Sequence, residues 1–186
     1  MQTTDNFLNY PILFLDYDGV LHPDEVFNLH NRGPYLNAPG HALFEYEHTL
    51  VEILQEFEPL KIILSTSWVR EFGFNKAKSF LCEELQARVI GGTYHNRLSQ
   101  DGGWASAWYD ISRYDQIRKW LGRNFAASWC AIDNDARGWP DSKMAQLIHT
   151  DDFEGLSNIS KQEELYKKLS TITGEWLHFN SDELNP

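Results

Sequence analysis

Short apolar runs recur along the chain with the length of buried β-strands. Ile12–Leu15 contains four apolar residues without a polar break, which is typical of a strand that is covered on both faces of a parallel sheet. Four later segments have a similar length, although some of them include polar residues. The predicted strands are 12–15, 60–64, 88–91, 129–132 and 146–150.

Segments with helical periodicity separate these strands. Their apolar residues recur at the three- and four-residue spacing that gives a helix one apolar face. Since strands and helices alternate, we expect an α/β fold, a three-layer sandwich around a mainly parallel, Rossmann-like sheet. We expect a single domain over 1–186 with its core at about 11–172, preceded by a polar arm and followed by a polar tail. The predicted helices are 41–57, 72–85, 112–121 and 156–169.

Composition and charge narrow the functional class. The 186 residues are 42% hydrophobic and carry a formal net charge of −11, which argues against strong non-specific binding to nucleic acid. Cys82 and Cys130, the only cysteines, lie in apolar contexts and are expected to be reduced thiols. The chain has no signal-like N-terminus and no apolar run of about 18 residues, so we expect a soluble cytoplasmic protein without a membrane partner.

Two carboxylates follow the first predicted strand directly. Asp16 ends the apolar run, Asp18 stands two positions further on, and Gly19 then allows a sharp turn. The crevice at the carboxyl ends of parallel strands is where open α/β sheets bind ligands. We therefore expect both carboxylates to face a binding site.

Two ionised carboxylates this close repel each other unless a cation lies between them or one holds a proton. Mg2+ suits the first condition, because it prefers oxygen ligands and commonly binds one or two carboxylates together with a substrate phosphate. Under the second condition, Asp18 acts as a general acid or base while Asp16 remains a nucleophile. Both conditions suit phosphoryl transfer. The alternatives are a loop of solvated acids and a calcium loop, although the EF-hand pattern places its glycine later.

Hydroxyl side chains follow the second predicted strand. Ser65, Thr66 and Ser67 lie between this strand and a helical segment, so their hydroxyl groups and the N–H groups of the helix start offer a site for phosphate oxygens. An ordinary N-cap cluster explains the same residues without a ligand. Arg70 is either a further phosphate contact or a solvated side chain on the helix surface.

Acids also follow the fourth predicted strand, where Asp133 and Asp135 flank Asn134. Because three predicted strands end in polar residues of this kind, we expect these side chains to converge at one edge of the sheet. Asn and Asp also favour hydrogen-bonded turns, which is the alternative explanation.

The apolar run followed by Asp-x-Asp-Gly-Val-Leu resembles motif I of the haloacid dehalogenase-like (HAD) superfamily of phosphohydrolases. The resemblance implies that Asp16 is the nucleophile, that Asp18 is the acid–base residue and that Mg2+ is the cofactor. Near the C-terminus, Gly-Leu-Ser at 155–157 followed by a helical pattern resembles the HAD domain of multi-module ("Swiss Army knife") RNA-repair proteins, and this resemblance covers most of the chain. In this family the region after motif I holds a hairpin flap, so the short loop at 22–40 implies a minimal cap.

Two further HAD motifs are matched residue by residue. Motif II is a strand that ends in Thr or Ser, which corresponds to Thr66, with Ser65 and Ser67 as alternatives. Motif III is usually a Lys that steadies the charge of the nucleophile. It corresponds to Arg113, at the start of a predicted helix, or to Lys119 further along the same helix.

Motif IV, a strand followed by acids that complete the Mg2+ shell, corresponds to Asp133 and Asp135. The resemblance implies that Asp133 binds the ion directly, together with Asp16 and the backbone carbonyl group of Asp18. Asn134 stands where many members of the superfamily have a second Asp.

From these motifs we expect a Mg2+-dependent phosphatase that acts through an aspartyl-phosphate. A small cap leaves the site open, which favours a phosphate on a nucleotide or at the end of a polynucleotide. The alternatives are a non-catalytic HAD-like sensor of a phosphorylated ligand and a phosphotransferase with an acceptor other than water. The predicted catalytic residues are Asp16, Asp18, Thr66 and Arg113; the predicted substrate-binding residues are Gly19, Ser65, Ser67, Arg70 and Lys119; the predicted metal ligands are Asp16, Asp18, Asp133 and Asp135.

The segment 92–114 is rich in aromatic residues, among them Tyr94, Trp104 and Trp108, and shows no clear strand or helix pattern. It is either a substrate-facing flap whose rings stack on a base or sugar, or a segment whose rings pack on the core.

Overall fold

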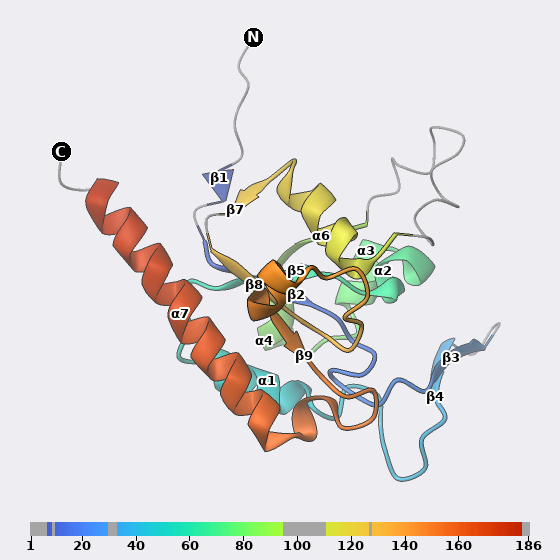
Figure 1. Ribbon diagram of the computed structural model, residues 1–186. Coiled ribbons are helices and arrows are strands. Elements are labelled where there is room, and N and C mark those ends of the chain that lie inside the picture. The colour runs from blue at the N-terminus through green and yellow to red at the C-terminus, as the bar shows by residue number, and fades with distance from the viewer. Residues whose placement is uncertain (1–6, 9, 30–32, 95–110, 127, 184–186) are drawn as a thin grey trace, which may run out of the picture.

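The computed structural model of the chain describes residues 7–8, 10–29, 33–94, 111–126 and 128–183 (Figure 1). Its centre is a five-stranded sheet in which every pair of neighbouring strands is parallel. The strands are β2 (Ile12–Leu15), β5 (Lys61–Leu64), β6 (Val89–Gly92), β8 (Trp129–Asp133) and β9 (Leu147–His149). The order across the sheet is β6-β5-β2-β8-β9, so the chain winds from β2 to one edge and then crosses to the other side. This arrangement confirms the predicted α/β, Rossmann-like fold.

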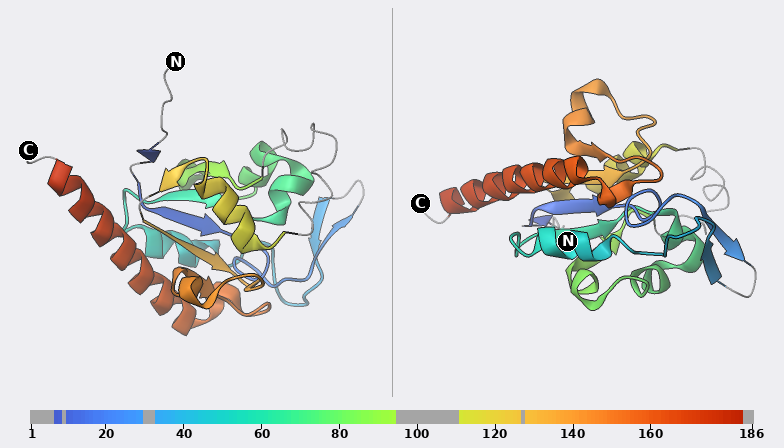
Figure 2. Two further views of the ribbon diagram at one scale, coloured as in Figure 1. Left: turned by 45° about the horizontal axis from the view of Figure 1, so that its top comes forward. Right: turned by 90° about the horizontal axis from the view of Figure 1, so that it is seen from below.

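Helices cover both faces of this sheet, as the right-hand view of Figure 2 shows. On one face, Leu13 and Leu15 of β2 belong to a buried cluster with residues of α1 (Glu47–Leu54), α4 (Glu83–Arg88) and α7 (Ile159–Glu183). On the other face, Ile12 and Phe14 pack with Ile117 and Trp120 of α6 (Arg113–Leu121). Since successive side chains of a strand point to opposite faces, the unbroken apolar run of β2 supplies both halves of the core.

The register of the strands brings the predicted motifs together. Leu15 pairs with Leu64 of β5 on one side and with Ile132 of β8 on the other. The next residues therefore lie side by side at the carboxyl edge: the backbone N–H of Ser65 donates to the carbonyl group of Leu15 (2.8 Å), and that of Asp16 donates to Ile132 (3.2 Å). The sequence predicted this convergence.

A small hairpin follows motif I. Strands β3 (Val26–Leu29) and β4 (Gly33–Leu36) are antiparallel and are reached from β2 through a turn at Asp16–Leu21. The hairpin corresponds to the flap that the HAD resemblance implied.

Several element boundaries differ from the prediction. The helix predicted at 41–57 begins only at Glu47, after turns in which Phe44 has a positive φ of 60°. The helix predicted at 72–85 is replaced by two shorter helices, α3 (Phe74–Lys78) and α4. A further helix, α2 (Ser67–Phe72), precedes them and ends at Gly73, whose φ of 81° lies outside the helical region.

Both ends of the described chain contain more regular structure than the sequence predicted. In the N-terminal arm, β1 (Phe7–Leu8) pairs in parallel with β7 (Phe125–Ala126). Helix α7 packs on the sheet through Leu165, Leu169 and Ile172, and it does not end in a polar tail near 172 but continues to Glu183. Two short 3-10 helices flank β9 and lead into α7: η2 (Asp141–Gln146) and η3 (Gly155–Ser157).

Two other predictions concern thiols and membranes. Cys82 and Cys130 are both free thiols, as expected. Among the helices that the structure describes, none combines the length and the apolar composition that a membrane span requires. Most of the aromatic segment, including Trp104 and Trp108, lies outside the described residues.

Candidate active site

Arg113 joins the two buried acids at the carboxyl edge of the sheet. Its Nη2 atom lies 3.1 Å from Oδ2 of Asp16, and its Nε atom lies 3.0 Å from Oδ2 of Asp133. Ser112 caps α6 by accepting the backbone N–H of Asp115 at 3.1 Å, which fixes where the helix starts and so where Arg113 points. Gln116, one turn further along, accepts a hydrogen bond from Nη1 of Arg113 at 3.3 Å.

The position of Arg113 separates the two candidates for motif III. Only 14% of the Arg113 side chain is exposed, and it bridges the end of β2 to the end of β8. Lys119 is exposed in the last turn of α6 and lines neither of the two cavities described below. The bridging geometry is that expected of the motif III cation, so the structure favours Arg113.

One guanidinium compensates two buried carboxylates incompletely. Burial raises the pKa of Asp16, and the nearby charge of Asp18 adds to this effect, while Arg113 works in the opposite direction. Burial raises the pKa of Asp133 further, and the charge of Asp16 contributes. Burial opposes the charge of Arg113, but the two carboxylates outweigh it and raise the pKa of the guanidinium, so Arg113 stays charged. The trio therefore needs a further positive charge, either a proton or a cation.

Asp133 retains an unsatisfied oxygen in this arrangement. Although Oδ2 of Asp133 and Nε of Arg113 lie 3.0 Å apart, the N–H bond does not point at the oxygen, and neither atom has a hydrogen-bond partner among the residues that the structure describes. The other oxygen of Asp133 accepts the backbone N–H of Asp135 at 2.9 Å. A buried carboxylate oxygen without a donor is costly, which again indicates that positive charge is missing.

Asp18 is held by three donors from different parts of the chain. The Nε1–H of Trp68 is shared between its two oxygens at 2.9 and 3.0 Å, and Nε2 of His22 lies 3.1 Å from Oδ1. The hydroxyl group of Ser67 donates to Oδ2 at 3.4 Å. The sequence analysis did not identify His22 or Trp68, although His22 follows Asp18 by one turn and Trp68 directly follows the predicted hydroxyl cluster.

The three hydroxyl residues of motif II have different positions. Thr66 is the N-cap of α2, and its Oγ1 accepts the backbone N–H of Trp68 at 3.3 Å, so the ordinary capping explanation holds for this contact. Thr66 and Ser67 also line a small cavity of about 140 Å³. Ser65 is buried, lines neither cavity, and its hydroxyl group has no hydrogen-bond partner. The structure therefore favours Thr66 and Ser67 as ligand contacts.

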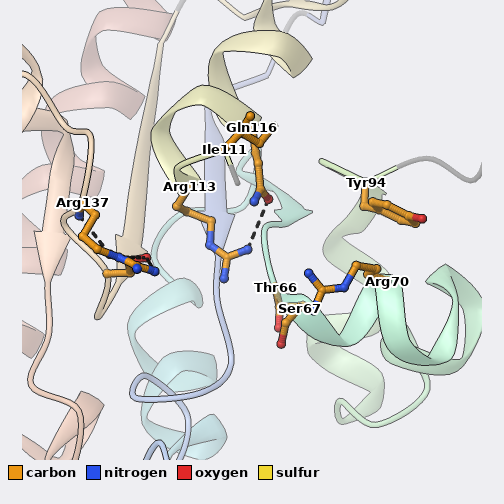
Figure 3. Close-up of a pocket in the computed structure, with 9 residues that line it drawn as sticks. Thr66, Ser67, Arg70, Tyr94, Ile111, Arg113, Gln116 and Arg137 are labelled. Atoms are coloured by element: carbon orange, nitrogen blue, oxygen red, sulfur yellow. Dashed lines mark hydrogen bonds and ion pairs between the residues drawn. The ribbon is translucent and has the colours of Figure 1, made fainter. Parts of the chain in front are cut away.

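The small cavity has a basic, polar wall. Figure 3 shows the guanidinium groups of Arg70 and Arg113 pointing toward the space beside Thr66 and Ser67, with Tyr94 lying over Arg70. Gln116 and Arg137 complete this side of the cavity. Sequence reasoning named Arg70 as a phosphate contact but did not identify Gln116 or Arg137.

A larger cavity of about 440 Å³ adjoins the first, and Ser67, Arg113, Asp135 and Arg137 line both. It lies in front of Asp16 and Asp18 and is otherwise lined by oxygen-bearing side chains. These are Asp24, Asn134 and Asp152.

Asn134 organises the rim of the larger cavity. Its Nδ2 group donates to Asp24 at 3.0 Å and to Asp152 at 2.9 Å, which ties three loops together. Gly19 lies directly beneath, because a Cβ atom at this position would approach the Asn134 side chain to 2.6 Å. Gly19 also has φ 67°, so it serves both the turn and the close approach.

Two predicted metal ligands pair with arginine side chains. Asp133 pairs with Arg113 and does not line the larger cavity, whereas its neighbour Asn134 does. Asp135 lines the cavity, but both of its oxygens bind Arg137, at distances of 2.7 to 3.1 Å. The contact with Arg137 lowers the pKa of Asp135. The ion pair forms locally because Arg137 is only two residues further along the chain, a preference that the apolar pattern does not reveal.

The carboxylate and amide oxygens that line the larger cavity fit a hydrated Mg2+ ion. Among the described residues, no three His, Cys, Asp or Glu side chains converge as a ready-made metal cage. Mg2+ does not need one, because it commonly keeps several waters and takes one or two carboxylates and substrate phosphate oxygens. The cavity offers Asp16, Asp18 and Asn134, and the charge deficit of the Arg113 trio favours a cation here.

Comparisons with known proteins support the HAD resemblance. A family model described as the HAD domain in Swiss Army Knife RNA repair proteins matches residues 12–160, which include Asp16, Thr66, Arg113 and Asp133. The comparisons with curated proteins and with solved structures found no significant match.

Proposed function

The chain belongs to this family of HAD domains, and on that premise we propose that it is a Mg2+-dependent phosphatase that hydrolyses a phosphomonoester through an aspartyl-phosphate. Membership of a HAD family supports phosphohydrolase chemistry in general. The observation that carries the proposal for this chain is the Arg113 bridge between Asp16 and Asp133, at the wall of a cavity that Asp18 also lines.

Each residue has a defined part in the proposed reaction. An oxygen of Asp16 attacks phosphorus while the bond to the leaving oxygen breaks, and Asp18 gives that oxygen a proton. Asp18 then takes a proton from water, the water oxygen attacks phosphorus, and the bond between Asp16 and phosphorus breaks. Arg113 and the Thr66 hydroxyl group bind non-reacting phosphate oxygens, where positive charge and donors favour the transition state.

The carboxylate of Asp16, the backbone carbonyl group of Asp18 and the side-chain oxygen of Asn134 would hold the metal ion, and Asp133 would serve mainly to orient Arg113. When bound, Mg2+ would neutralise charge on the phosphoryl group and on the nucleophile.

The walls of the site support a substrate larger than inorganic phosphate. Asp16 lines the larger cavity, and the adjoining smaller one presents Arg70, Arg137 and the Tyr94 ring, groups that suit a further anion and a planar ring. Together with the RNA-repair proteins named in the family description, this supports a terminal phosphate of a nucleotide or polynucleotide as the substrate.

Phosphate release with Mg2+ tests the proposal. The substrates are p-nitrophenyl phosphate, mononucleotides and 3′-phosphorylated oligonucleotides, and EDTA should abolish turnover. Asp16→Asn should retain the fold by circular dichroism and lose at least ~10³-fold in kcat. Retained turnover in this variant would exclude Asp16 as the nucleophile. Tight Mg2+-dependent ligand binding without turnover would indicate a sensor, and acceptor-dependent products would indicate a phosphotransferase.

A further inference from the structure

We propose that His22 and Trp68 are positioning residues, which hold the Asp18 carboxylate in one orientation for proton exchange with the leaving group. The inference rests on the proposed phosphatase function and assigns roles to two side chains outside the four HAD motifs. It is carried by a chain of hydrogen bonds that begins at the backbone of Phe44 and ends at Asp18.

The position of the proton on the His22 ring follows from its partners. His22 has no exposed surface, and its Nδ1 atom lies 3.2 Å from the backbone nitrogen of Phe44. A backbone N–H group can only donate, so Nδ1 must accept and carries no proton. The ring proton is then on Nε2, which lies 3.1 Å from Oδ1 of Asp18. His22 therefore acts as a fixed donor to Asp18.

The backbone of Phe44 is held in an unusual conformation to make this contact. Phe44 has φ 60° and is the only non-glycine residue with a positive φ among those that the structure describes. Such a conformation persists where the surroundings determine it, and it is common near functional sites. The Phe44 ring packs edge-on against the rings of His22, Trp68 and Tyr17, with centroids 5.0 to 5.2 Å apart. The same aromatic cluster thus fixes the backbone N–H group of Phe44 and the rings of His22 and Trp68, which contact Asp18.

Trp68 is the second ring that donates to the carboxylate. Because Thr66 caps α2, Trp68 lies in the first turn of that helix with only 2% of its surface exposed, and its Nε1–H group spans both oxygens of Asp18. Oδ1 thus has donors from His22 and Trp68, whereas Oδ2 shares the Trp68 donor and has only a long contact of 3.4 Å with the rotatable Ser67 hydroxyl group. The difference leaves Oδ2 as the oxygen for proton exchange with the substrate.

This role predicts a dependence on the leaving group. An alkoxide leaving group needs a proton, whereas p-nitrophenolate leaves readily without one. Loss of the His22 or Trp68 donor should therefore slow the hydrolysis of an alkyl phosphate much more than that of p-nitrophenyl phosphate. A merely structural role would lower both rates by the same factor.

The experiment compares kcat/KM, which reports the steps up to departure of the leaving group, for glycerol phosphate and p-nitrophenyl phosphate, with Mg2+, in the wild-type protein and in variants. His22→Leu removes the donor at similar bulk, and we expect kcat/KM for the alkyl phosphate to fall about tenfold to a hundredfold, with a change of less than about threefold for the aryl phosphate. His22→Gln retains an N–H donor of similar reach and should recover most of the loss. His48→Leu is the matched control, because His48 is on the exposed face of α1, and both rates should be unchanged.

Equal losses on both substrates, or no recovery in His22→Gln, would overturn the proposal. If His22→Leu does not fold, Trp68→Phe removes the other donor while it keeps an aromatic ring, and the same inequality between substrates is expected. Nitrogen NMR of the wild-type His22 ring tests the geometry separately from turnover: a proton on Nε2 is expected, and a proton on Nδ1 would overturn the inference. If the wild-type protein or Asp16→Asn behaves contrary to the proposed function, the failure lies there, and the expected leaving-group effect fails with it.

Discussion

Two arginine–aspartate contacts at the site have similar distances and opposite surroundings. Arg113 lies 3.0 to 3.1 Å from Asp133 and Asp16, and Arg137 lies 2.7 to 3.1 Å from Asp135. The Arg113 side chain is 14% exposed and its partners are almost fully buried, whereas the Arg137 side chain is 88% exposed.

The difference teaches that burial, rather than distance, decides what an ion pair does here. A buried charge that loses its partner is strongly destabilising, while exposed pairs are screened by water and contribute little. The Arg113 trio is therefore a fixed part of the sheet edge with an unmet need for positive charge. The Arg137 pair can open at low cost when a ligand arrives.

Replacement of Arg113 should have the largest effect. Arg113→Met leaves two buried carboxylates without a cation, so the free energy of unfolding at pH 7 should fall by about 3–5 kcal/mol, and turnover should be lost. Urea denaturation and phosphate release measure these effects. The double variant Arg113→Met with Asp133→Asn should recover part of the stability. A single variant as stable as the wild type would show that the trio is not a buried charge cluster.

Mg2+ should stabilise the folded protein next most strongly. At a concentration one hundred times its Kd, an ion that binds only the folded state adds about 2.7 kcal/mol to the free energy of unfolding. Thermal denaturation with and without Mg2+ measures this as a rise in Tm. Asn134→Leu should reduce the rise, because it removes an oxygen from the cavity, whereas Lys119→Ala should not. An undiminished shift in Asn134→Leu would place the ion elsewhere.

Neutralising Asp133 should stabilise the metal-free protein by less than Mg2+ stabilises the wild type. The pKa of Asp133 is raised in the folded state, so the folded protein binds more protons than the unfolded chain between the ordinary Asp pKa and the raised one. Stability therefore falls as pH rises through this window. Asp133→Asn should remove this pH-dependent fall in stability and so raise the free energy of unfolding at pH 7 by on the order of 1 kcal/mol.

The pH dependence gives the control for this variant. Below about pH 3.9 the Asp133 carboxyl group is protonated in both states, so the gain should shrink toward zero. A gain that is independent of pH would mean that packing, rather than charge, is responsible.

Replacement of Arg137 should have the smallest effect on stability. Arg137→Met removes an exposed pair, and we expect no measurable change in urea denaturation. Any effect should appear in KM for oligonucleotide substrates, since Arg137 lines both cavities. A loss of stability comparable to that of Arg113→Met would contradict the distinction between the two pairs.

Much of the fold was predictable because the central strands are apolar on both faces. The five sheet strands lie within or close to the predicted runs, and the resulting register brought Asp16, Thr66 and Asp133 to one edge. Helix boundaries were less predictable. The positive φ of Phe44 accompanies ring contacts that are distant in the sequence, and the apolar pattern reveals neither the positive φ of Gly73 nor the length of α7.

The site was predictable where it lies at strand ends and unpredictable where loops meet. Arg113 could be named because it starts a capped helix, but its two partners could not be inferred from the chain around it. Trp68 and His22 look like ordinary core residues in the sequence; the turn after β2 directs His22 at Asp18, and the start of α2 directs Trp68 at the same carboxylate. The pairing of Asp135, a predicted metal ligand, with Arg137 could not be inferred, because Arg137 is an exposed residue outside the apolar pattern.

The register in which β2 pairs with β5 and β8 has a consequence for refolding. A one-residue slip between β2 and β8 would turn Asp133 to the opposite face of the sheet and separate it from Arg113, even though most of the apolar contacts could re-form. Recovered activity after denaturation would therefore report correct strand alignment, which far-UV circular dichroism cannot distinguish from a slipped sheet.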